Sequence, residues 1–331
     1  MLLLTLACAE PEAEVHFDDP ASDGSFGVVT EEHPFGDAKL QLWLPSSDAR
    51  GGLEDYDDLL EGIAQRSGVP DCSEPRPVVV FSHGNGGIRW QSLFLTERLA
   101  AHGYVVAAPD HAGNTLWDDS APRSLVASTR PLDVAAAFDF VVDQYGDCVD
   151  EDAGYAVVGH SFGGWTSLAV TGATVNVAEF TAACESGDPW LCGLEAYIDG
   201  EFGDWQDERA WGAVPMTPVG AHDFGEGLVD QDRPILLMSG DDDTLTSLED
   251  QVEPIYRGVS GAPKSLAVLQ GTGHYSFSQM CVLIASVNGC EDEFLPPEQA
   301  HPMINHLTLA FLGQQRGFDT SLPALEGVDW F

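Results

Sequence analysis

One serine of the chain lies in a setting that can make it a nucleophile. Residues 159–163 (GHSFG) form a G-x-S-x-G motif between a β-branched segment, 155–159 (YAVVG), and an apolar segment, 162–171, with helical character. A sharp strand-to-helix turn would strain the backbone of Ser161, and small glycines let such a turn close. The hydroxyl would then be exposed at the positive end of the following helix. The setting therefore favours a nucleophilic serine over an ordinary glycine-rich turn.

A serine hydroxyl is a poor nucleophile at neutral pH, so it needs a histidine base and a carboxylate that orients this base. After Ser161 the chain offers these groups in the order acid, then base. Residues 240–244 (GDDDT) follow one predicted strand, and residues 271–274 (GTGH) follow the next. We therefore expect His274 to be the base and one of the three aspartates to be its partner. Two alternatives for the aspartates are a solvated surface and a site for a hard cation, although no EF-hand spacing follows.

Ten histidines compete for the role of base. We expect His160, inside the motif, to pack away from the nucleophile. His111 follows a predicted strand and could line the pocket. Six others are less suited: His16 and His33 precede the fold, His102 ends a helix, and no strand end would deliver His222, His301 or His306 to the serine. His274 is therefore the preferred base.

Catalysis by a serine also needs donors that face the oxyanion of the tetrahedral intermediate. One expected donor is the backbone N–H of Phe162, directly after the serine. The other is expected in residues 83–87 (HGNGG), a glycine-rich loop after a buried strand, and we assign it to Asn85. The alternative is a plain strand-to-helix turn.

These residues need a scaffold, and the chain alternates predicted strands with predicted helices. The strands are 39–44 (half-exposed), 77–82, 104–108, 155–159, 235–239 and 265–270, and the helices are 90–102, 132–145, 162–171, 248–259 and 303–312. This alternation predicts an α/β fold whose central sheet is mostly parallel and covered by helices on both faces. Such sheets place chemistry at the carboxyl ends of their strands. Residues 172–209 interrupt the alternation and are predicted to form a small cap insertion.

The composition limits the partners. The chain has 331 residues, with 13 Lys and Arg against 54 Asp and Glu, which gives a net charge of −41. Nucleic acids and anionic lipid surfaces both attract basic patches, so the charge argues against either as a partner. No later segment is apolar for long enough to cross a bilayer. The oligomeric state stays open, and a halophilic or marine origin is one hypothesis for the acidity.

The N-terminal residues indicate export. Residues 1–8 (MLLLTLAC) look like the end of a bacterial lipoprotein signal, in which the cysteine after a small residue is lipidated. A basic first segment is missing and the apolar run is short, so a frayed apolar tail is the alternative. Residues 9–25 are acidic and predict a solvated tether. The folded domain is then 26–331, and any membrane attachment would be through a lipid on Cys8.

The other cysteines support an oxidising location. Six remain after Cys8, and no CxxC or Cys/His cluster suggests zinc. Two pairs are close in sequence, which leaves the third by elimination: Cys184 with Cys192, Cys281 with Cys290, and Cys72 with Cys148. Six cysteines allow 15 connectivities, so this pairing is a hypothesis.

The ordered segments FSHGNGG, HGYVVAAPDH, VVGHSFGG, GDDDT and GTGHYSF resemble bacterial dienelactone-hydrolase-like proteins. More narrowly, they are similar to the branch related to platelet-activating-factor acetylhydrolases. The resemblance runs from about residue 40 to 306. It implies an α/β-hydrolase fold and a carboxylic-ester hydrolase with Ser161, Asp243 and His274, because relatives usually carry the acid three places after the glycine. It also implies oxyanion donors at Asn85 and Phe162, and no cofactor or metal.

The resemblance leaves the substrate open. Dienelactone hydrolases proper use a cysteine where this chain has Ser161, so dienelactone is not expected as the substrate, and a small-molecule or lipid-like ester is. Aromatic side chains could bound an acyl pocket: Phe162, Trp165, Trp190 and Trp205. Two alternative functions are a lipid-anchored, non-catalytic binding module on the same fold, and an acyltransferase or polyester hydrolase with the same triad.

Overall fold

The computed structural model describes residues 18–187, 190–284 and 286–331. Its centre is an eleven-stranded sheet in which six neighbouring strands run parallel. In spatial order these are β6 (Val105–Pro109), β5 (Val78–Ser82), β7 (Tyr155–His160), β10 (Ala210–Met216), β11 (Ile235–Gly240) and β12 (Lys264–Leu269). This arrangement confirms the predicted α/β class.

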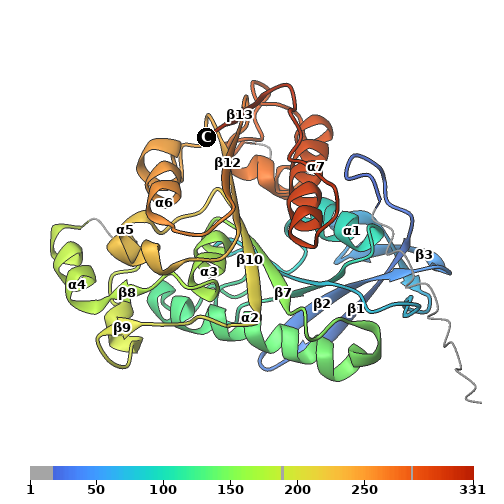
Figure 1. Ribbon diagram of the computed structural model, residues 1–331, viewed down its shortest axis with the longest axis horizontal. Coiled ribbons are helices and arrows are strands. Elements are labelled where there is room, and N and C mark those ends of the chain that lie inside the picture. Colours follow the sequence, from blue (N-terminus) through green and yellow to red (C-terminus); the bar gives the residue numbers. More distant parts are fainter. Residues whose placement is uncertain (1–17, 188–189, 285) are drawn as a thin grey trace, which may run out of the picture.

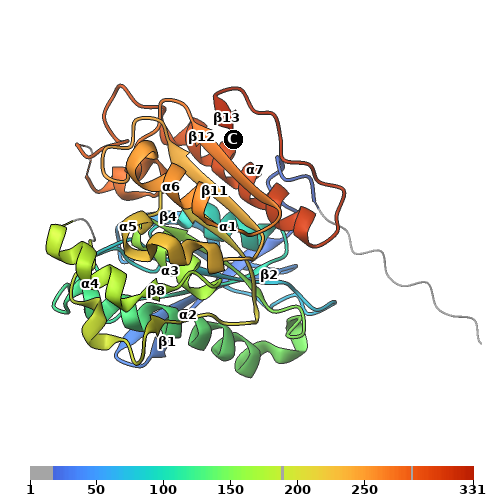
Figure 2. The same cartoon turned by 60° about the vertical axis from the view of Figure 1, so that its left-hand side comes forward.

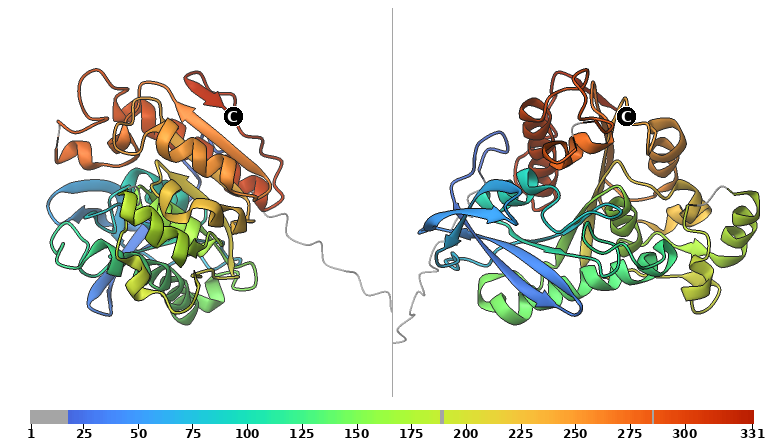
Figure 3. Two further views of the ribbon diagram at one scale, coloured as in Figure 1. Left: turned by 90° about the vertical axis from the view of Figure 1, so that its left-hand side faces the viewer. Right: turned by 180° about the vertical axis from the view of Figure 1, so that it is seen from behind.

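The remaining strands extend the sheet at both edges. Beyond β6 lie four early strands, in the order β2 (Ala38–Ser46), β1 (Gly27–Phe35), β4 (Leu60–Ser67) and β3 (Arg50–Tyr56), and β13 (Val328–Trp330) is antiparallel to β12 at the other edge. The contact of β2 with β6 is also antiparallel. Figure 3 shows the early strands in blue at one edge of the molecule.

Side chains alternate along the parallel strands and pack on opposite faces, so both faces need a cover. On β5, Val79 and Phe81 belong to one hydrophobic cluster, whereas Val78 and Val80 belong to another. Helices α1 (Leu93–Ala101) and α7 (Pro297–Gln315) cover the first face, and α2 (Arg123–Tyr145), α3 (Phe162–Val170) and α6 (Glu253–Gly258) cover the second. Figure 1 shows α1 and α7 on one side of the twisted sheet and α3 and α6 on the other.

The segment between α3 and β10, predicted as a cap, contains short elements that do not join the main sheet. They are β8 (Val175–Asn176), α4 (Val177–Ser186), a 3-10 helix (Leu194–Tyr197) and β9 (Phe202–Gly203), and the first and last strands pair with each other. Figure 2 shows α4 and β8 projecting beside α3 and α5 (Ala221–Phe224).

Three disulfides join the cysteine pairs that the sequence predicts. Cys72 is bonded to Cys148, Cys184 to Cys192, and Cys281 to Cys290. The first closes a long loop from the early strands to the end of α2, and the other two close short loops. Three disulfides are typical of proteins that fold in an oxidising compartment.

Some local predictions need correction. Residues 39–44 were expected in a half-exposed strand, but β2 is buried from Leu40 onward, because one of its faces packs in the cluster that contains α1 and the other in the cluster that contains α2. The predicted helix at 248–259 is confirmed, although it begins with a π-helical turn, Leu248–Val252, that continues directly into α6. In the described part of the chain, no helix is both long and apolar enough to cross a bilayer.

The N-terminal predictions fall partly outside the structure. Cys8 and residues 9–17 of the predicted tether lie outside the described residues. Residues 18–25 contact the end of α1: the Ser22 hydroxyl lies 3.4 Å from His102 Nε2, and the Asp23 carboxylate pairs with Arg98. The backbone N–H of Phe26 then donates to the Ala101 carbonyl, 3.0 Å away.

Candidate active site

Ser161 occupies the turn between β7 and α3 with φ 56° and ψ −112°. A non-glycine residue with positive φ is strained and persists only where its surroundings hold it. The surroundings are tight: a Cβ on Gly163 would lie 1.8 Å from the Ser82 carbonyl oxygen, and one on Gly159 would lie 2.0 Å from that of Gly163. The Ser161 N–H also donates to the Met216 carbonyl at 2.9 Å. The glycines of the motif are therefore required by close backbone approach.

Asp243 and His274 lie together at the carboxyl ends of β11 and β12. These strands are parallel neighbours, so the loops that follow them leave the sheet at the same edge. The distance from Asp243 Oδ2 to His274 Nδ1 is 2.8 Å, and both side chains are buried. Burial acts to raise the pKa of Asp243, but the hydrogen bond and charge of His274 and the N–H groups of Leu245 and Thr246 outweigh it, so the pKa is lowered. The carboxylate therefore stays ionised beside the imidazole.

The neighbouring aspartates are placed differently. Asp241 Oδ1 accepts the Thr272 N–H at 3.3 Å, and both Asp241 and Asp242 are exposed. Among the residues that the structure describes, no cluster of three His, Cys, Asp or Glu side chains could hold a metal ion.

Thr246 is a further polar contact of this pair, and the sequence did not reveal it. Its hydroxyl oxygen lies 2.9 Å from Asp243 Oδ2, 3.1 Å from His274 Nδ1 and 2.9 Å from the Thr217 carbonyl oxygen. Asp243 Oδ1 in turn accepts the N–H groups of Leu245 and Thr246, each at 2.8 Å. This is an Asx-type turn, so an aspartate three residues before a threonine was the available signal.

Asn288 connects the acid and base loops from a third loop. Its Oδ1 accepts the His274 N–H at 2.8 Å and the Thr244 N–H at 3.3 Å, while its Nδ2 donates to the Asp242 carbonyl at 2.9 Å. Asn288 lies inside the loop closed by the Cys281–Cys290 disulfide. Sequence reasoning missed this residue, because nothing in its neighbourhood distinguishes it from an ordinary loop asparagine.

The loop after β5 lies against the serine. A Cβ placed on Gly84 would be 3.5 Å from Ser161 Cβ, and Asn85 lines the same cavity as Ser161. The Asn85 side-chain oxygen accepts from Asn114 Nδ2 at 3.1 Å. Phe162 is the first residue of α3, where N–H groups have no partner inside the helix. The structure thus places Phe162 directly after Ser161 at the start of α3, and Asn85 in the lining of the same cavity.

The side chain of Arg130 binds this loop, a contact that sequence reasoning missed. The side chain is fully buried and donates to the carbonyl oxygens of His83 at 2.6 Å and Gly84 at 3.0 Å. It also donates to Asn114 Oδ1 at 2.8 Å and lies 4.2 Å from the centre of the Phe162 ring. Burial lowers the pKa of Arg130 to about 9. It therefore remains a cation at neutral pH, in contact with the two residues that precede Asn85 in the loop.

Gln91 and His160 form a buried bridge between the loop after β5 and the base. Gln91 Oε1 accepts the Gly84 N–H at 3.0 Å, its Nε2 lies 2.7 Å from His160 Nδ1, and His160 Nε2 lies 2.9 Å from the His274 carbonyl oxygen. A carbonyl can only accept, so the imidazole carries its proton on Nε2 and accepts from Gln91 at Nδ1. Burial first, then the neighbouring His274, lowers the pKa of His160 to about 3, so it is neutral.

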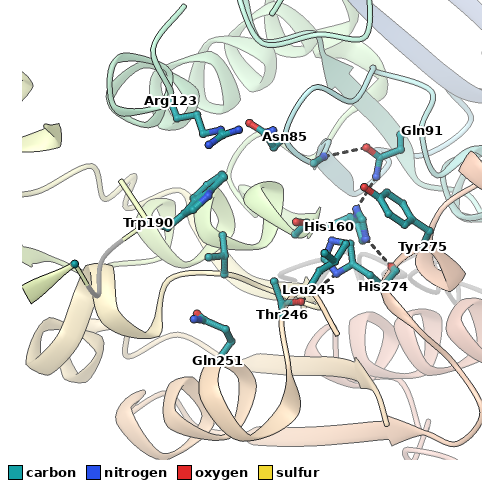
Figure 4. Close-up of a pocket in the computed structure, with 14 residues that line it drawn as sticks. Asn85, Gln91, Arg123, His160, Trp190, Leu245, Thr246, Gln251, His274 and Tyr275 are labelled. Carbon is teal, nitrogen blue, oxygen red and sulfur yellow. Dashed lines mark hydrogen bonds between the residues drawn. The ribbon is translucent and has the colours of Figure 1, made fainter. Parts of the chain in front are cut away.

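The position of His160 corrects one expectation. Its ring was expected to pack away from the nucleophile, but it lines the cavity of Ser161, 4.8 Å from the His274 ring centre. Figure 4 shows His160 between Gln91 and His274. His111 behaves differently: it is buried between Ser82, 2.9 Å away, and Asp133, 2.8 Å away, and does not line this cavity.

The cavity at Ser161 has a volume of about 620 Å³. Of the four aromatic side chains expected around an acyl pocket, Trp190 lines the cavity and stands edge-on to the Phe162 ring, with centres 4.9 Å apart. Phe162 and Trp165 are buried in the core instead, where Trp165 contacts Trp205 and stacks on Phe224.

The comparisons with known proteins agree with this architecture. A model of the alpha/beta hydrolase family matches residues 79–287, and the chain belongs to that family. The chain is also similar to platelet-activating factor acetylhydrolase from Canis lupus familiaris, with 28% identity over 141 residues, and to the same enzyme from Bos taurus, with 27% over 141 residues. Each match covers 29% of this chain and 32% of the relative, so the chain spans about a third of the length of these curated relatives.

The chain is therefore a member of the alpha/beta hydrolase family with weak similarity to acetylhydrolases. The matched residues contain Ser161, Asp243 and His274, and the family resemblance seen in the sequence is confirmed.

Proposed function

We propose that the chain hydrolyses carboxylic esters through an acyl-enzyme on Ser161. The observation that carries this proposal is the hydrogen bond of Asp243 with His274, at 2.8 Å, beside a cavity that a strained Ser161 also lines. A buried carboxylate on Nδ1 leaves Nε2 of the imidazole to accept a proton from the serine. A small-molecule or lipid-like ester fits the cavity volume and the similarity to acetylhydrolases.

Acylation would proceed in two stages. His274 takes the Ser161 proton while the hydroxyl oxygen attacks the ester carbonyl, and the N–H groups of Asn85 and Phe162 bind the resulting oxyanion. The intermediate then collapses, the C–O bond to the alcohol breaks, and His274 returns the proton to the departing alkoxide. The products are the alcohol and an ester of Ser161.

Deacylation would repeat these stages with water. His274 removes a proton from water, the hydroxide attacks the acyl-enzyme, and the acid leaves as Ser161 recovers its proton. Asp243 compensates the charge of the imidazolium in each half-reaction. None of these steps uses a cofactor.

Hydrolysis of p-nitrophenyl esters with short and medium acyl chains tests the proposal. We expect wild type to hydrolyse them and Ser161→Ala to lose the activity. Ser167→Ala is a matched control, because this buried serine lies on α3 and its hydroxyl donates to the Gly164 carbonyl. Equal rates in wild type and Ser161→Ala would contradict the role of Ser161. Specific binding of esters with no turnover would favour a non-catalytic binding module.

We further propose that residues 172–209 act as a cap over the cavity. Trp190, which belongs to this segment, lines the cavity and supports this role.

We also propose that the chain is exported and anchored by a lipid on Cys8. The three disulfides support an oxidising compartment. Expression in a bacterial host tests the anchor: wild type should fractionate with membranes, whereas Cys8→Ala should not. Equal fractionation of both proteins would contradict it.

A further inference from the structure

The catalytic cavity differs in charge from the rest of the molecule. The chain carries a net charge of −41, with 54 acidic residues. The described residues that line the cavity include no Asp or Glu, and they include one arginine, Arg123. The other lining residues are apolar, polar uncharged or histidine. An arginine in a cavity whose described lining has no carboxylate, in so acidic a chain, indicates that Arg123 has a role there.

Arg123 also differs from the other basic residues in its partners. Nine of them pair with carboxylates: Lys39, Arg50, Arg66, Arg76, Arg89, Arg98, Arg209, Arg233 and Arg257. Arg130 and Lys264 donate to backbone carbonyls, and Arg316 lies over the Phe318 ring. Within the described ranges, no carboxylate pairs with Arg123.

Arg123 is an exposed residue that lines the cavity, and its contact with Trp190 leaves its N–H donors available. It is the first residue of α2, and its guanidinium carbon lies 5.2 Å from the centre of the Trp190 ring. A cation–π contact is not a hydrogen bond, so the N–H groups of the guanidinium remain able to bind an anion in bidentate fashion. Figure 4 shows the side chain reaching towards Asn85, with Leu245 and Gln251 on the opposite side of the cavity.

We propose that Arg123 binds an anionic group of the ester substrate, a carboxylate or a phosphate, and thereby selects acidic esters. The inference rests on the proposed esterase function and adds the class of substrate. Arginine suits this task because its planar donors match both oxyanion groups. The binding is local, since the acidic surface repels anions at longer range and salt screens that repulsion.

Two pairs of esters test the proposal and separate the two anions. The first pair compares mono-p-nitrophenyl glutarate, which has a free carboxylate on the acyl side, with the same compound in which this carboxylate is a methyl ester. The second pair compares monobutyryl glycerol phosphate, which has a phosphate on the alcohol side, with monobutyryl glycerol. We expect kcat/KM of wild type to favour the anionic member of at least one pair by about tenfold, mainly through KM.

The variants are Arg123→Gln and Arg123→Lys. Arg123→Gln should lose the preference because kcat/KM falls more on the anionic than on the neutral esters, and Arg123→Lys should keep part of the preference. Arg66→Gln is the matched control, because it removes the same charge from an exposed arginine on β4 that pairs with Glu54. It should leave the preference unchanged.

Three results would overturn the inference. The inference would be wrong if wild type showed no preference in either pair. It would also be wrong if Arg123→Gln lost the same factor in rate on neutral and anionic esters, because Arg123 would then stabilise the oxyanion beside Asn85 or the fold. Hydrolysis of no ester at all would remove the proposed function and this inference together.

Binding to Ser161→Ala gives a readout that does not depend on turnover. Calorimetry with that variant should show about tenfold tighter binding of the preferred anionic ester, and the double variant with Arg123→Gln should lose the difference. Equal affinities for the two members of both pairs would contradict the inference even if the esterase proposal holds.

Discussion

Replacement of Gln91 by methionine tests whether the buried bridge positions the reacting groups. The change keeps the approximate volume but removes both hydrogen bonds of the amide, to the Gly84 N–H and to His160 Nδ1. Gln91 is only 4% exposed, so water cannot easily replace it. A lost hydrogen bond costs about 1 kcal/mol, and a buried group left unpaired about 1–3 kcal/mol. We expect a loss of about 3 kcal/mol in the free energy of unfolding.

The effect on the rate distinguishes positioning from stability alone. Gly84 precedes the proposed oxyanion donor Asn85, and His160 holds the backbone of His274. A displacement of about 1 Å at such groups costs about 10²-fold in rate. We therefore expect kcat on p-nitrophenyl butyrate to fall about 100-fold, with KM within threefold of wild type, in steady-state assays well below the melting temperature.

Gln231→Met is the matched control. Gln231 is also fully buried and also donates through its amide, to Thr171 Oγ1 at 3.3 Å and the Arg233 carbonyl at 3.1 Å, but it lies outside the cavity lining. It should lose stability and keep kcat within about twofold. If Gln91→Met lost stability to the same extent and also kept its kcat, the bridge would have no role in positioning.

Three further outcomes follow from particular contacts. Asp243→Asn should lower kcat by about 10³–10⁴-fold, because an amide no longer fixes the imidazole tautomer or compensates its charge; a loss below tenfold in the same esterase assay would contradict this. Burial raises the pKa of Asp223 to about 6 from 3.8, so the protonated form is favoured in the fold and stability falls as pH rises through this interval. Denaturation should therefore show the stability of Asp223→Asn relative to wild type rising by about 2 kcal/mol between pH 4 and pH 8, and a constant difference would exclude the effect. Replacement of Cys72 and Cys148 by serine should cost about 4 kcal/mol in urea unfolding, because their sequence separation of 76 restricts the unfolded chain strongly; a cost below about 1 kcal/mol would argue against this origin.

The sequence predicted those parts of the molecule that short-range constraints determine. The run 78–82 is β-branched and apolar on both faces, and it forms the central strand β5. The glycines around Ser161 predicted a tight turn, and the strained φ of Ser161 agrees with it. The parallel order of β11 and β12 then explains why two short loops, far apart in sequence, place Asp243 beside His274.

Contacts between distant segments could not be predicted in the same way. Gln91 meets His160, 69 residues away, and Asn288 meets Asp242, 46 residues away. Neither residue type is distinctive for such a position, because surface glutamines and asparagines are common. The expectation for His160 failed for the same reason: the rule that it faces away from the nucleophile ignores the carbonyl of His274, which only the folded chain brings close.

The extent of the early sheet was also missed. Residues 50–56 and 60–67 contain glycine and many charged or polar residues, which gives no clear alternation, yet they pair as β3 and β4. Their pairing depends on the turn between them and on the contact of β4 with β1 in the sheet. Neither feature can be recognised from the local pattern of residues.

The most direct test of the proposed mechanism is labelling with a fluorophosphonate, followed by mass spectrometry of the peptides. Only a serine activated by a neighbouring base should react at neutral pH. We expect one adduct per chain, on Ser161, in wild type and in Ser167→Ala, and none in Ser161→Ala. Labelling that persists in Ser161→Ala, or a wild type that stays unlabelled while folded, would contradict the assignment of Ser161 as an activated nucleophile.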